Sequence, residues 1–250
     1  MTDRVALVTG GGRGIGQAIA VQIAAEGARV ALLARSEDEL NHTAKLIADH
    51  GGEASIHVTD ISEAGRMAAA LAAITAHWGP VDVLVNNAAT VAPLGASATL
   101  DPDEWADAIT LNVIAAARLS FAVLPAMLDQ RWGRIVNVSS SIAAHPGGML
   151  RANAYATSKA ALEAHTLNLA AELSDTEVTV NAFRPGGVDT AMQAWIRDQN
   201  PEQIGAELHQ RFASNYEQGT LLTAAQSASL LLPQIATSAT GQIWDAADAT

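Results

Sequence analysis

The sequence predicts an α/β fold: a doubly wound parallel sheet of seven strands with helices on both faces. Short runs rich in β-branched residues alternate with longer segments of helical spacing, and a glycine-rich turn follows the first run. Aromatic residues make up only 4% of the 250 residues, which suits helices packed closely on a sheet. Strands that alternate with helices form βαβ units, whose crossovers bury a parallel sheet on both faces.

Seven apolar runs are the expected strands. They are Arg4–Val8, Arg29–Ala34, Ala54–Thr59, Val81–Asn86, Arg134–Ser139, Val178–Phe183 and Gly241–Trp244. No linker, low-complexity tract or repeat separates these runs, so we expect one domain over residues 1–250.

Two segments between the expected strands have unusual patterns. Residues 101–130 are helical but apolar on more than one face, so they are either buried within the monomer or part of a subunit interface. We expect a homo-oligomer, a dimer or a tetramer, formed through the helices at about 101–130 and 155–174. Residues 186–220 are polar, interrupted by glycine and long, which indicates a substrate lid or a disordered stretch.

Charge and composition exclude several classes of partner. The net charge is −12 with only 14 Lys and Arg, so binding to nucleic acid or to an anionic membrane surface is not expected. No window of about 18 consecutive strongly apolar residues is evident, so no membrane span is expected. The absence of Cys excludes disulfides and thiolate zinc sites, and we expect no metal. A cytoplasmic protein is the default expectation.

The glycine-rich turn predicts a phosphate-binding site. The first strand runs into Thr9-Gly10-Gly11-Gly12-Arg13-Gly14-Ile15-Gly16, and a helical pattern follows at once. A helix N-terminus offers unpaired N–H groups and a positive dipole end to a phosphate. The spacing G-x-x-x-G-x-G differs from the common G-x-G-x-x-G fingerprint, and a tight turn without ligand is the alternative. Its position after the first strand of a βαβ series favours a dinucleotide.

The end of the second strand indicates which dinucleotide binds. NAD sites usually place an acidic residue there, whereas this chain has Ala34 followed by Arg35. A guanidinium can bind a 2′-phosphate through two hydrogen bonds, and Arg13 could add a second positive charge. We therefore expect NADP(H) in preference to NAD(H). The alternative is that Arg35 is a solvated surface charge and that Arg13 pairs with a local acid.

Tyr155 and Lys159 form a candidate acid/base pair. Their spacing of four residues places them on the same face of a predicted helix, in a chain with only two Tyr and two Lys. A free phenol has a pKa of about 10, and a nearby ammonium lowers that pKa by charge attraction. A packed Tyr beside a solvated Lys is the alternative for this motif taken alone.

The glycine turn and the Tyr–Lys pair together resemble the short-chain dehydrogenase/reductase family of NAD(P)-dependent oxidoreductases with a Rossmann fold. The resemblance extends over nearly the whole chain and implies a catalytic set of Asn112, Ser140, Tyr155 and Lys159. Fifteen residues separate Ser140 from Tyr155, about two more than the family commonly has, so Ser139 and Ser141 are alternatives for the serine.

The resemblance also implies a cofactor site. Asp60 matches the acid that contacts the adenine amino group, Asn86-Asn87-Ala88-Ala89 is similar to the family's N-N-A-G, and Pro185-Gly186 with Thr190 matches the turn that holds the carboxamide. Ala89 replaces the usual Gly and must keep φ below zero or accept strain. The implied cofactor-binding residues are Gly10, Arg13, Gly14, Ile15, Gly16, Arg35, Asp60, Ile61, Asn87, Ala88, Tyr155, Lys159, Pro185, Gly186, Val188 and Thr190.

The implied activity is hydride transfer between NADP(H) and a ketone or secondary alcohol. Tyr155 would act as general acid or base, Lys159 would lower the pKa of the phenol and bind the ribose, Ser140 would orient the carbonyl, and Asn112 would hold a relay water.

The substrate is expected to be a small carbonyl or alcohol compound in an apolar pocket. The expected walls are Val91, Leu94, Met149, Met192 and Trp195. Two other functions remain open, an epimerase or dehydratase that retains its cofactor and a sensor that binds the dinucleotide without catalysis.

Overall fold

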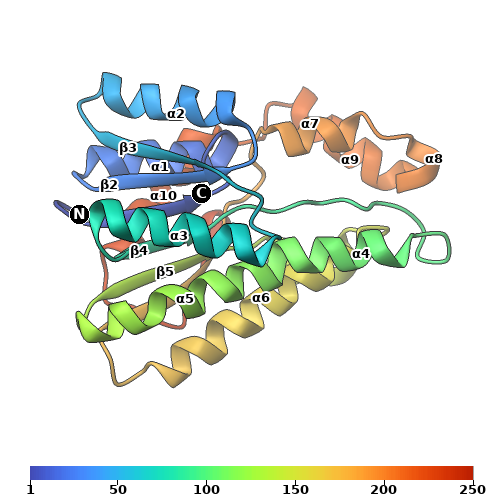
Figure 1. Cartoon of the computed structure of the whole chain (residues 1–250). Coiled ribbons are helices and arrows are strands. Elements are labelled where there is room, and N and C mark those ends of the chain that lie inside the picture. The colour runs from blue at the N-terminus through green and yellow to red at the C-terminus, as the bar shows by residue number, and fades with distance from the viewer. Residues whose placement is uncertain (250) are drawn as a thin grey trace.

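The computed structural model describes residues 1–249 and has helices on both faces of one sheet (Figure 1). Within these residues seven parallel strands pair in the order β3-β2-β1-β4-β5-β6-β7. The strands are β1 (Val5–Thr9), β2 (Arg29–Ala34), β3 (Glu53–Val58), β4 (Val83–Asn86), β5 (Gly133–Val138), β6 (Val178–Arg184) and β7 (Ile243–Asp245). The predicted fold class is confirmed, and each strand lies within two residues of its predicted ends.

Helices occupy the segments between the strands. They are α1 (Gly14–Ala25), α2 (Glu37–Asp49), α3 (Ala64–Trp78), α4 (Pro102–Ile109), α5 (Ala115–Asp129), α6 (Asn153–Glu172), α7 (Ala191–Arg197), α8 (Pro201–Ile204), α9 (Ala206–Glu217) and α10 (Ala224–Ile235). Short 3₁₀ turns, η2 (Ser141–Ala143), η3 (Pro146–Gly148) and η4 (Ala246–Ala249), follow β5 and β7.

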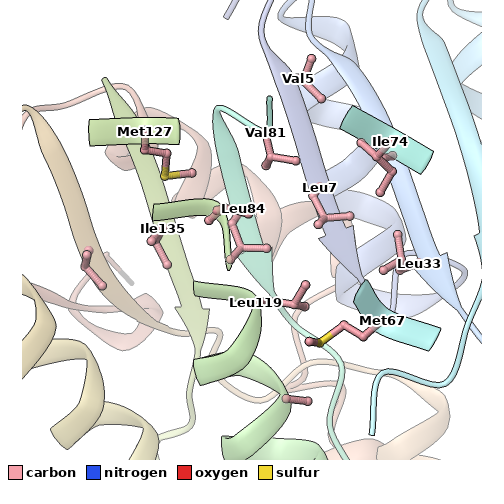
Figure 2. Close-up of a cluster of buried hydrophobic side chains, with 14 of the residues drawn as sticks. Val5, Leu7, Leu33, Met67, Ile74, Val81, Leu84, Leu119, Met127 and Ile135 are labelled. Atoms are coloured by element: carbon pink, nitrogen blue, oxygen red, sulfur yellow. The ribbon is translucent and has the colours of Figure 1, made fainter. Parts of the chain in front are cut away.

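Two apolar layers hold the helices on the sheet. Successive side chains of a strand point to opposite faces, so Leu7 joins the layer under α3, α5 and α6, whereas Val8 joins the layer under α1, α2 and α10. Figure 2 shows the first layer, in which Leu7 and Leu84 of neighbouring strands lie near Leu119 of α5. The sheet is therefore buried on both faces, as a parallel sheet requires.

The strand order places one edge of the sheet where a ligand can bind. The chain winds outward from β1 to β3 and then returns to β4, which pairs on the other side of β1. The carboxyl ends of β1 and β4 meet at this reversal, the usual position for ligands in an open α/β sheet. The glycine-rich turn, Asn87 and Ser140 all follow strands at this edge.

The predicted helix over residues 101–130 has an interruption. A π-helical segment, η1 (Thr110–Ile114), joins α4 to α5. By length and composition alone the combined helix Pro102–Asp129 could span a membrane, with a mean hydropathy of 1.7 in its most apolar window, a test that core helices also pass. Leu119, Val123 and Met127 of α5 nevertheless lie in the core, which explains much of that hydropathy.

The segment at residues 186–220 is largely helical rather than an irregular loop. It contains α7, α8 and α9, which extend beyond the carboxyl end of the sheet (Figure 1). Ile196, Ile204 and Leu208 of these helices pack with Val91 and Met149 in a third apolar cluster. The segment therefore lies over the loops that follow β4 and β5.

The turn between β1 and α1 has no room for a side chain at Gly16. A Cβ added there would lie 2.3 Å from the Gly10 carbonyl oxygen and 2.4 Å from Asn87 Nδ2. Gly10 and Gly14 adopt φ values of +64° and +57°, which favour glycine. The three glycines of the G-x-x-x-G-x-G pattern are thus required by the backbone.

Gly16→Ala is expected to lower the free energy of unfolding by about 2–3 kcal/mol, because the new methyl group overlaps backbone atoms. Urea unfolding measures the change. Gly65→Ala in α3 is the matched control, since nothing lies within 4 Å of its added Cβ. That control is expected to be neutral or stabilising by up to about 1 kcal/mol. Equal effects of the two substitutions would contradict the steric explanation.

Candidate active site

Four predicted catalytic side chains come together at the carboxyl edge of the sheet. Ser140 follows β5, Asn112 lies in η1, and Tyr155 and Lys159 lie one turn apart on α6. The helix α6 packs against β5, β6, η1 and η2, which brings these elements into one site.

Ser140 is the serine that meets Tyr155. The Ser140 side chain lies within hydrogen-bonding reach of the Tyr155 phenol and opposes part of the rise in the pKa of that phenol. Ser139 instead donates from Oγ to Glu163 Oε1 at 2.7 Å, and Ser141 is exposed in η2. The alternation of side chains at the end of β5 thus separates three neighbouring serines, and the phenol contact favours Ser140 over the two alternatives.

Lys159 is buried beside the phenol but does not donate to it. Its Nζ donates to the Val138 carbonyl oxygen at 2.7 Å and lies 5.7 Å from the centre of the Tyr155 ring. Burial lowers the pKa of Lys159 to about 8, while Glu163 opposes that change. Burial also raises the pKa of Tyr155, against the effect of Ser140. The expected lowering of the Tyr155 pKa by Lys159 is therefore wrong, because desolvation dominates.

Asn112 connects the helix layer to the loop after β4. Its Oδ1 accepts from the Thr90 N–H at 2.8 Å, while its Nδ2 donates to the Thr90 carbonyl at 2.8 Å and to Ser158 Oγ at 2.9 Å. Asn112 therefore contacts the residue that precedes Lys159 on α6. Its amide positions the backbone there, and its role with a relay water stays a prediction.

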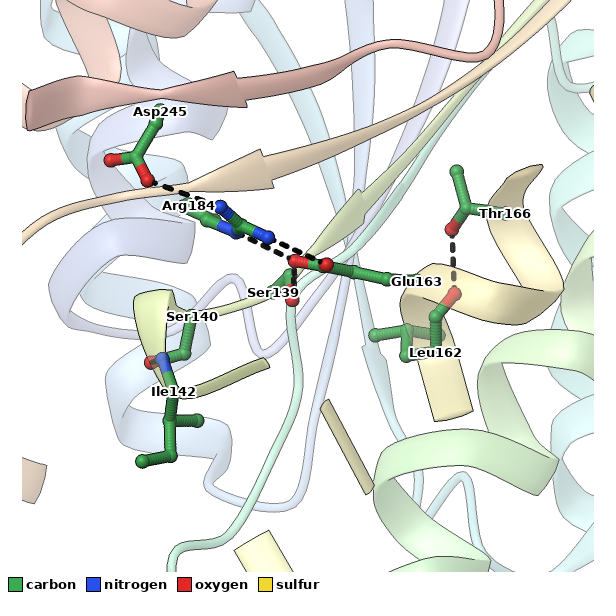
Figure 3. A network of polar contacts seen from close by, with 8 residues as sticks. All are labelled: Ser139, Ser140, Ile142, Leu162, Glu163, Thr166, Arg184 and Asp245. Carbon is green, nitrogen blue, oxygen red and sulfur yellow. Dashed lines mark hydrogen bonds and ion pairs between the residues drawn. The ribbon is translucent and has the colours of Figure 1, made fainter. Parts of the chain in front are cut away.

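A buried ionic network beside Lys159 was not predicted from the sequence. Glu163 on α6 accepts from Ser139 and from Arg184 at the end of β6, and Arg184 reaches Asp245 on β7 (Figure 3). At the sequence level Glu163 is one acidic residue in a helix, and its partners lie 21 and more residues away along the chain. The only signal available was its spacing of four residues from Lys159.

The loop after β4 is fastened to the glycine-rich turn. The Thr9 Oγ1 accepts from the N–H groups of Asn87 and Ala88, both at 3.0 Å, and Asn87 Nδ2 donates to the Thr9 carbonyl. Ala89 is not among the described non-glycine residues with positive φ, so it keeps the ordinary backbone that its substitution for Gly requires.

The turn fits the diphosphate of a dinucleotide. The helix α1 begins at Gly14 without a side-chain cap and without an acidic residue in its first turn, so its N–H groups and positive end are available to an anion. Thr190 lies on the other side of this position, with Cγ2 3.5 Å from a Cβ built on Gly14. Ile15 is half-buried behind the turn, in contact with the apolar layer on that face.

Both arginines, Arg13 and Arg35, lie where the adenosine part of the dinucleotide is expected to bind. Arg35 has a side chain that is 78% exposed, and its ion pair with Asp60 is long at 3.8 Å. Arg13 pairs with Glu39 at 3.1 Å, as the alternative for that residue proposed. Asp60 accepts from the N–H and Oγ of Ser62, which lowers its pKa and caps the turn before α3. Ile61 is buried in the core beneath it.

The segment after β6 borders the glycine-rich turn between β1 and α1. Ser227 of α10 donates to the Pro185 carbonyl at 2.9 Å, and Gly186 has a φ of +78°. Val188 is buried and pairs in a short bridge with Leu222, and Thr190 caps α7 by accepting from Gln193. These contacts direct the chain from the sheet edge into α7.

Most of the expected substrate walls lie in one apolar cluster. Val91, Leu94 and Met149 are buried there, and Tyr155 and Met192 pack against them. Trp195 is 39% exposed and lies outside the cluster. The described residues hold no group of three or more His, Asp or Glu side chains placed to bind a metal.

Comparison with known proteins places the chain among reductases. The family model for short chain dehydrogenase matches residues 4–201. The 3-oxoacyl-[acyl-carrier-protein] reductase FabG of Pseudomonas aeruginosa is 40% identical over 204 residues, 82% of this chain and 81% of that protein.

Solved structures agree over almost the full length. A variant actinorhodin polyketide ketoreductase with NADPH has a TM-score of 0.87 at 34% identity and covers 97% of this chain and 95% of that chain. An NAD⁺-bound xylitol dehydrogenase has the same TM-score of 0.87 at 26% identity, with 98% of each chain covered. The chain therefore belongs to the short-chain dehydrogenase family, and its predicted class, an NAD(P)-dependent oxidoreductase acting on C=O and CH–OH groups, is confirmed.

Proposed function

We propose that the protein reduces a ketone with NADPH and that Tyr155 gives the proton to the substrate oxygen. The observation that carries the proposal is the Ser140 hydroxyl beside the Tyr155 phenol, next to the buried amine of Lys159. Two hydroxyl groups held together at an apolar wall can both donate to one carbonyl oxygen.

The protonation of the phenol supports the reductive direction. Burial raises the pKa of Tyr155, so the phenol carries its proton at neutral pH and can act as a general acid. The ammonium of Lys159 then stabilises the phenolate left after transfer. Bound NADPH would supply the hydride, and Ser140 would hold the carbonyl oxygen during the transfer.

The apolar cluster supports a ketone substrate with an apolar body. Val91, Leu94 and Met149 form an apolar cluster with Ile196 and Leu208 of the 186–220 segment, and the half-buried Tyr155 packs against this cluster. We propose that this segment acts as the substrate lid of the single domain. Relatives named 3-oxoacyl-[acyl-carrier-protein] reductase and polyketide ketoreductase make acyl ketones the first substrates to test.

Consumption of NADPH with a panel of acyl ketones tests the proposed activity. A reductase consumes NADPH in step with substrate. An epimerase or dehydratase that retains its cofactor would form product without net loss of NADPH, and a sensor would bind NADPH without turnover. Either of those results would replace the proposal.

Tyr155→Phe is expected to reduce turnover by about 10²–10⁴-fold, because it removes the proton donor. Binding of NADPH, followed by its fluorescence, should remain within about threefold, because the ring is kept. Tyr216→Phe is the matched control, since Tyr216 is the other tyrosine and is 52% exposed on α9. Retained turnover in the Tyr155 variant would rule out the assigned role.

Arg35 supports the preference for NADP(H). The NADPH-bound and NAD⁺-bound neighbours share this fold equally well, so the fold alone does not select the cofactor. Arg13 pairs closely with Glu39 at 3.1 Å, whereas Arg35, just after β2, pairs with Asp60 only at 3.8 Å. Arg35 is therefore the residue better placed to bind a 2′-phosphate.

Arg35→Ala is expected to weaken NADPH binding by about 10–100-fold, the usual effect of losing hydrogen bonds to a charged group. Binding of NADH should change little, and calorimetric titration of both nucleotides measures the difference. Arg66→Ala is the control, because Arg66 is similarly exposed and pairs with Glu63 in α3. An equal loss for NADPH and NADH would contradict a contact with the 2′-phosphate.

We also propose that the chain forms a homo-oligomer through α5 and α6. Large apolar side chains remain exposed on these helices, among them Phe121 at 56%, Leu128 at 37% and Leu167 at 40%. Exposed apolar patches of this kind usually mark association surfaces.

Phe121→Asp is expected to shift the protein toward the monomer, because a charge would be buried in the interface. Light scattering coupled to size-exclusion chromatography measures the mass. Val58→Asp is the control, since Val58 is 52% exposed at the edge strand β3, away from α5. A monomeric wild-type protein would contradict the proposal.

A further inference from the structure

The carboxylate of Glu163 is held at both oxygens inside the protein. Arg184 donates from Nε to Oε1 and from Nη2 to Oε2, both at 2.8 Å, and Ser139 Oγ donates to Oε1 at 2.7 Å. The residue is 7% exposed. Figure 3 shows the side chains of Glu163 and Arg184 meeting end to end beside Ser139. A carboxylate that accepts from three donors at this depth is fixed in position.

The same network reaches two segments that carry predicted catalytic residues. One is α6, which carries Lys159, and the other is the end of β5, which leads to Ser140. Lys159 lies one turn before Glu163 on α6, and its Nζ is bound to the carbonyl of Val138. Ser139 follows Val138 and precedes Ser140. Glu163 and Lys159 therefore bind two consecutive residues at the end of β5, just before the serine that contacts Tyr155.

Glu163 supplies the negative charge next to the buried amine of Lys159, one helical turn away on α6, and its attraction raises the pKa of that amine. Asp245 pairs with Arg184 at 3.5 Å, on the other end of the network. Other charges near α6 are remote or solvated. The side chains of Asp103, Glu104 and Asp107 on α4 are exposed, Arg134 lies at the opposite end of β5, and η1 and η2 carry no charged residue.

We propose that Glu163, clamped by Arg184, is a positioning residue that keeps the Lys159 amine protonated and fixes the end of β5 that carries Ser140. The inference rests on the proposed function and adds two residues to it. Glu163 touches neither substrate nor Tyr155 in this arrangement and acts through Lys159 and Ser139.

Two substitutions that should shift the titration midpoint of Lys159 in opposite directions test the proposal. Glu163→Gln removes the anion whose attraction raises the pKa of Lys159, so the titration midpoint of Lys159 should fall from about 8 by about one pH unit or more. Arg184→Gln removes the competing cation and should raise that midpoint. A purely structural role would not move the midpoint in opposite directions.

The titration can be read directly in the cofactor-free protein. The chain has only two lysines, Lys45 and Lys159, so labelling with [ε-13C]lysine gives two resonances that a Lys45→Arg variant assigns. Lys45 is exposed and pairs with Asp49, and it serves as the internal reference. This readout does not depend on turnover, so it can fail or succeed separately from the proposed reductase activity.

The pH dependence of kcat/KM gives the second readout. The ammonium is lost as the pH rises through its pKa, so the activity of the wild-type protein should fall above a pH of about 8, and that of Glu163→Gln should fall at lower pH. Asp245→Asn is the control, because Arg184 keeps both bonds to Glu163, and its Lys159 midpoint should not change.

Three results bear on the proposal. Opposite shifts in the two charge variants, with none in the control, would support it. Unchanged midpoints, or shifts in the same direction, would overturn it. If Glu163→Gln does not fold, the titration of Arg184→Gln decides alone. A Lys159 midpoint that fails to rise in that variant would contradict the proposal.

Discussion

The peptide unit between Val138 and Ser139 is the constraint on which the site depends. Its carbonyl accepts from Lys159 of α6, and its N–H donates to the Phe183 carbonyl of β6 at 2.7 Å. One peptide therefore joins a helix and two strands at the point where Ser140 begins. A shift of that peptide would move the serine and the lysine together, and displacements of about 1 Å already cost catalytic rate. The burial of Lys159 is the consequence of this arrangement, since the amine must reach the sheet to make the bond.

The features predicted well from the sequence are those set by local rules. Strand and helix periods identified the layers, and the glycines at 10, 14 and 16 follow from the backbone of a single turn. Ser140 directly follows the predicted strand Arg134–Ser139, and strand alternation explains why the Ser139 side chain turns instead toward Glu163. Each of these inferences needs only neighbouring residues, so an isolated sequence is sufficient.

The features missed depend on burial and on distant partners. The direction of the Tyr155 pKa was mistaken because charge attraction can be read from a spacing of four residues, whereas desolvation depends on loops and helices far along the chain. Glu163 meets Arg184 only because β6 lies beside β5 in the sheet. The helices of residues 186–220 are short and separated by Asn200 and Gly205, so their pattern resembled a loop, and packing against Val91 and Met149 stabilises them.

Local charge, rather than net charge, determines how this acidic chain can hold an anionic dinucleotide. The net charge of −12 repels the bound cofactor only weakly. Salt screens those exposed charges that lie more than about 8 Å from the cofactor. The uncapped N-terminus of α1 and the exposed guanidinium of Arg35 act at hydrogen-bond distance, where screening is small. The same reasoning applies to Lys159, whose ionisation follows from burial and from Glu163 and is independent of the acidic surface. In both places the protein sets the local electrostatics with one or two fixed side chains, which is why single charge substitutions can separate their roles.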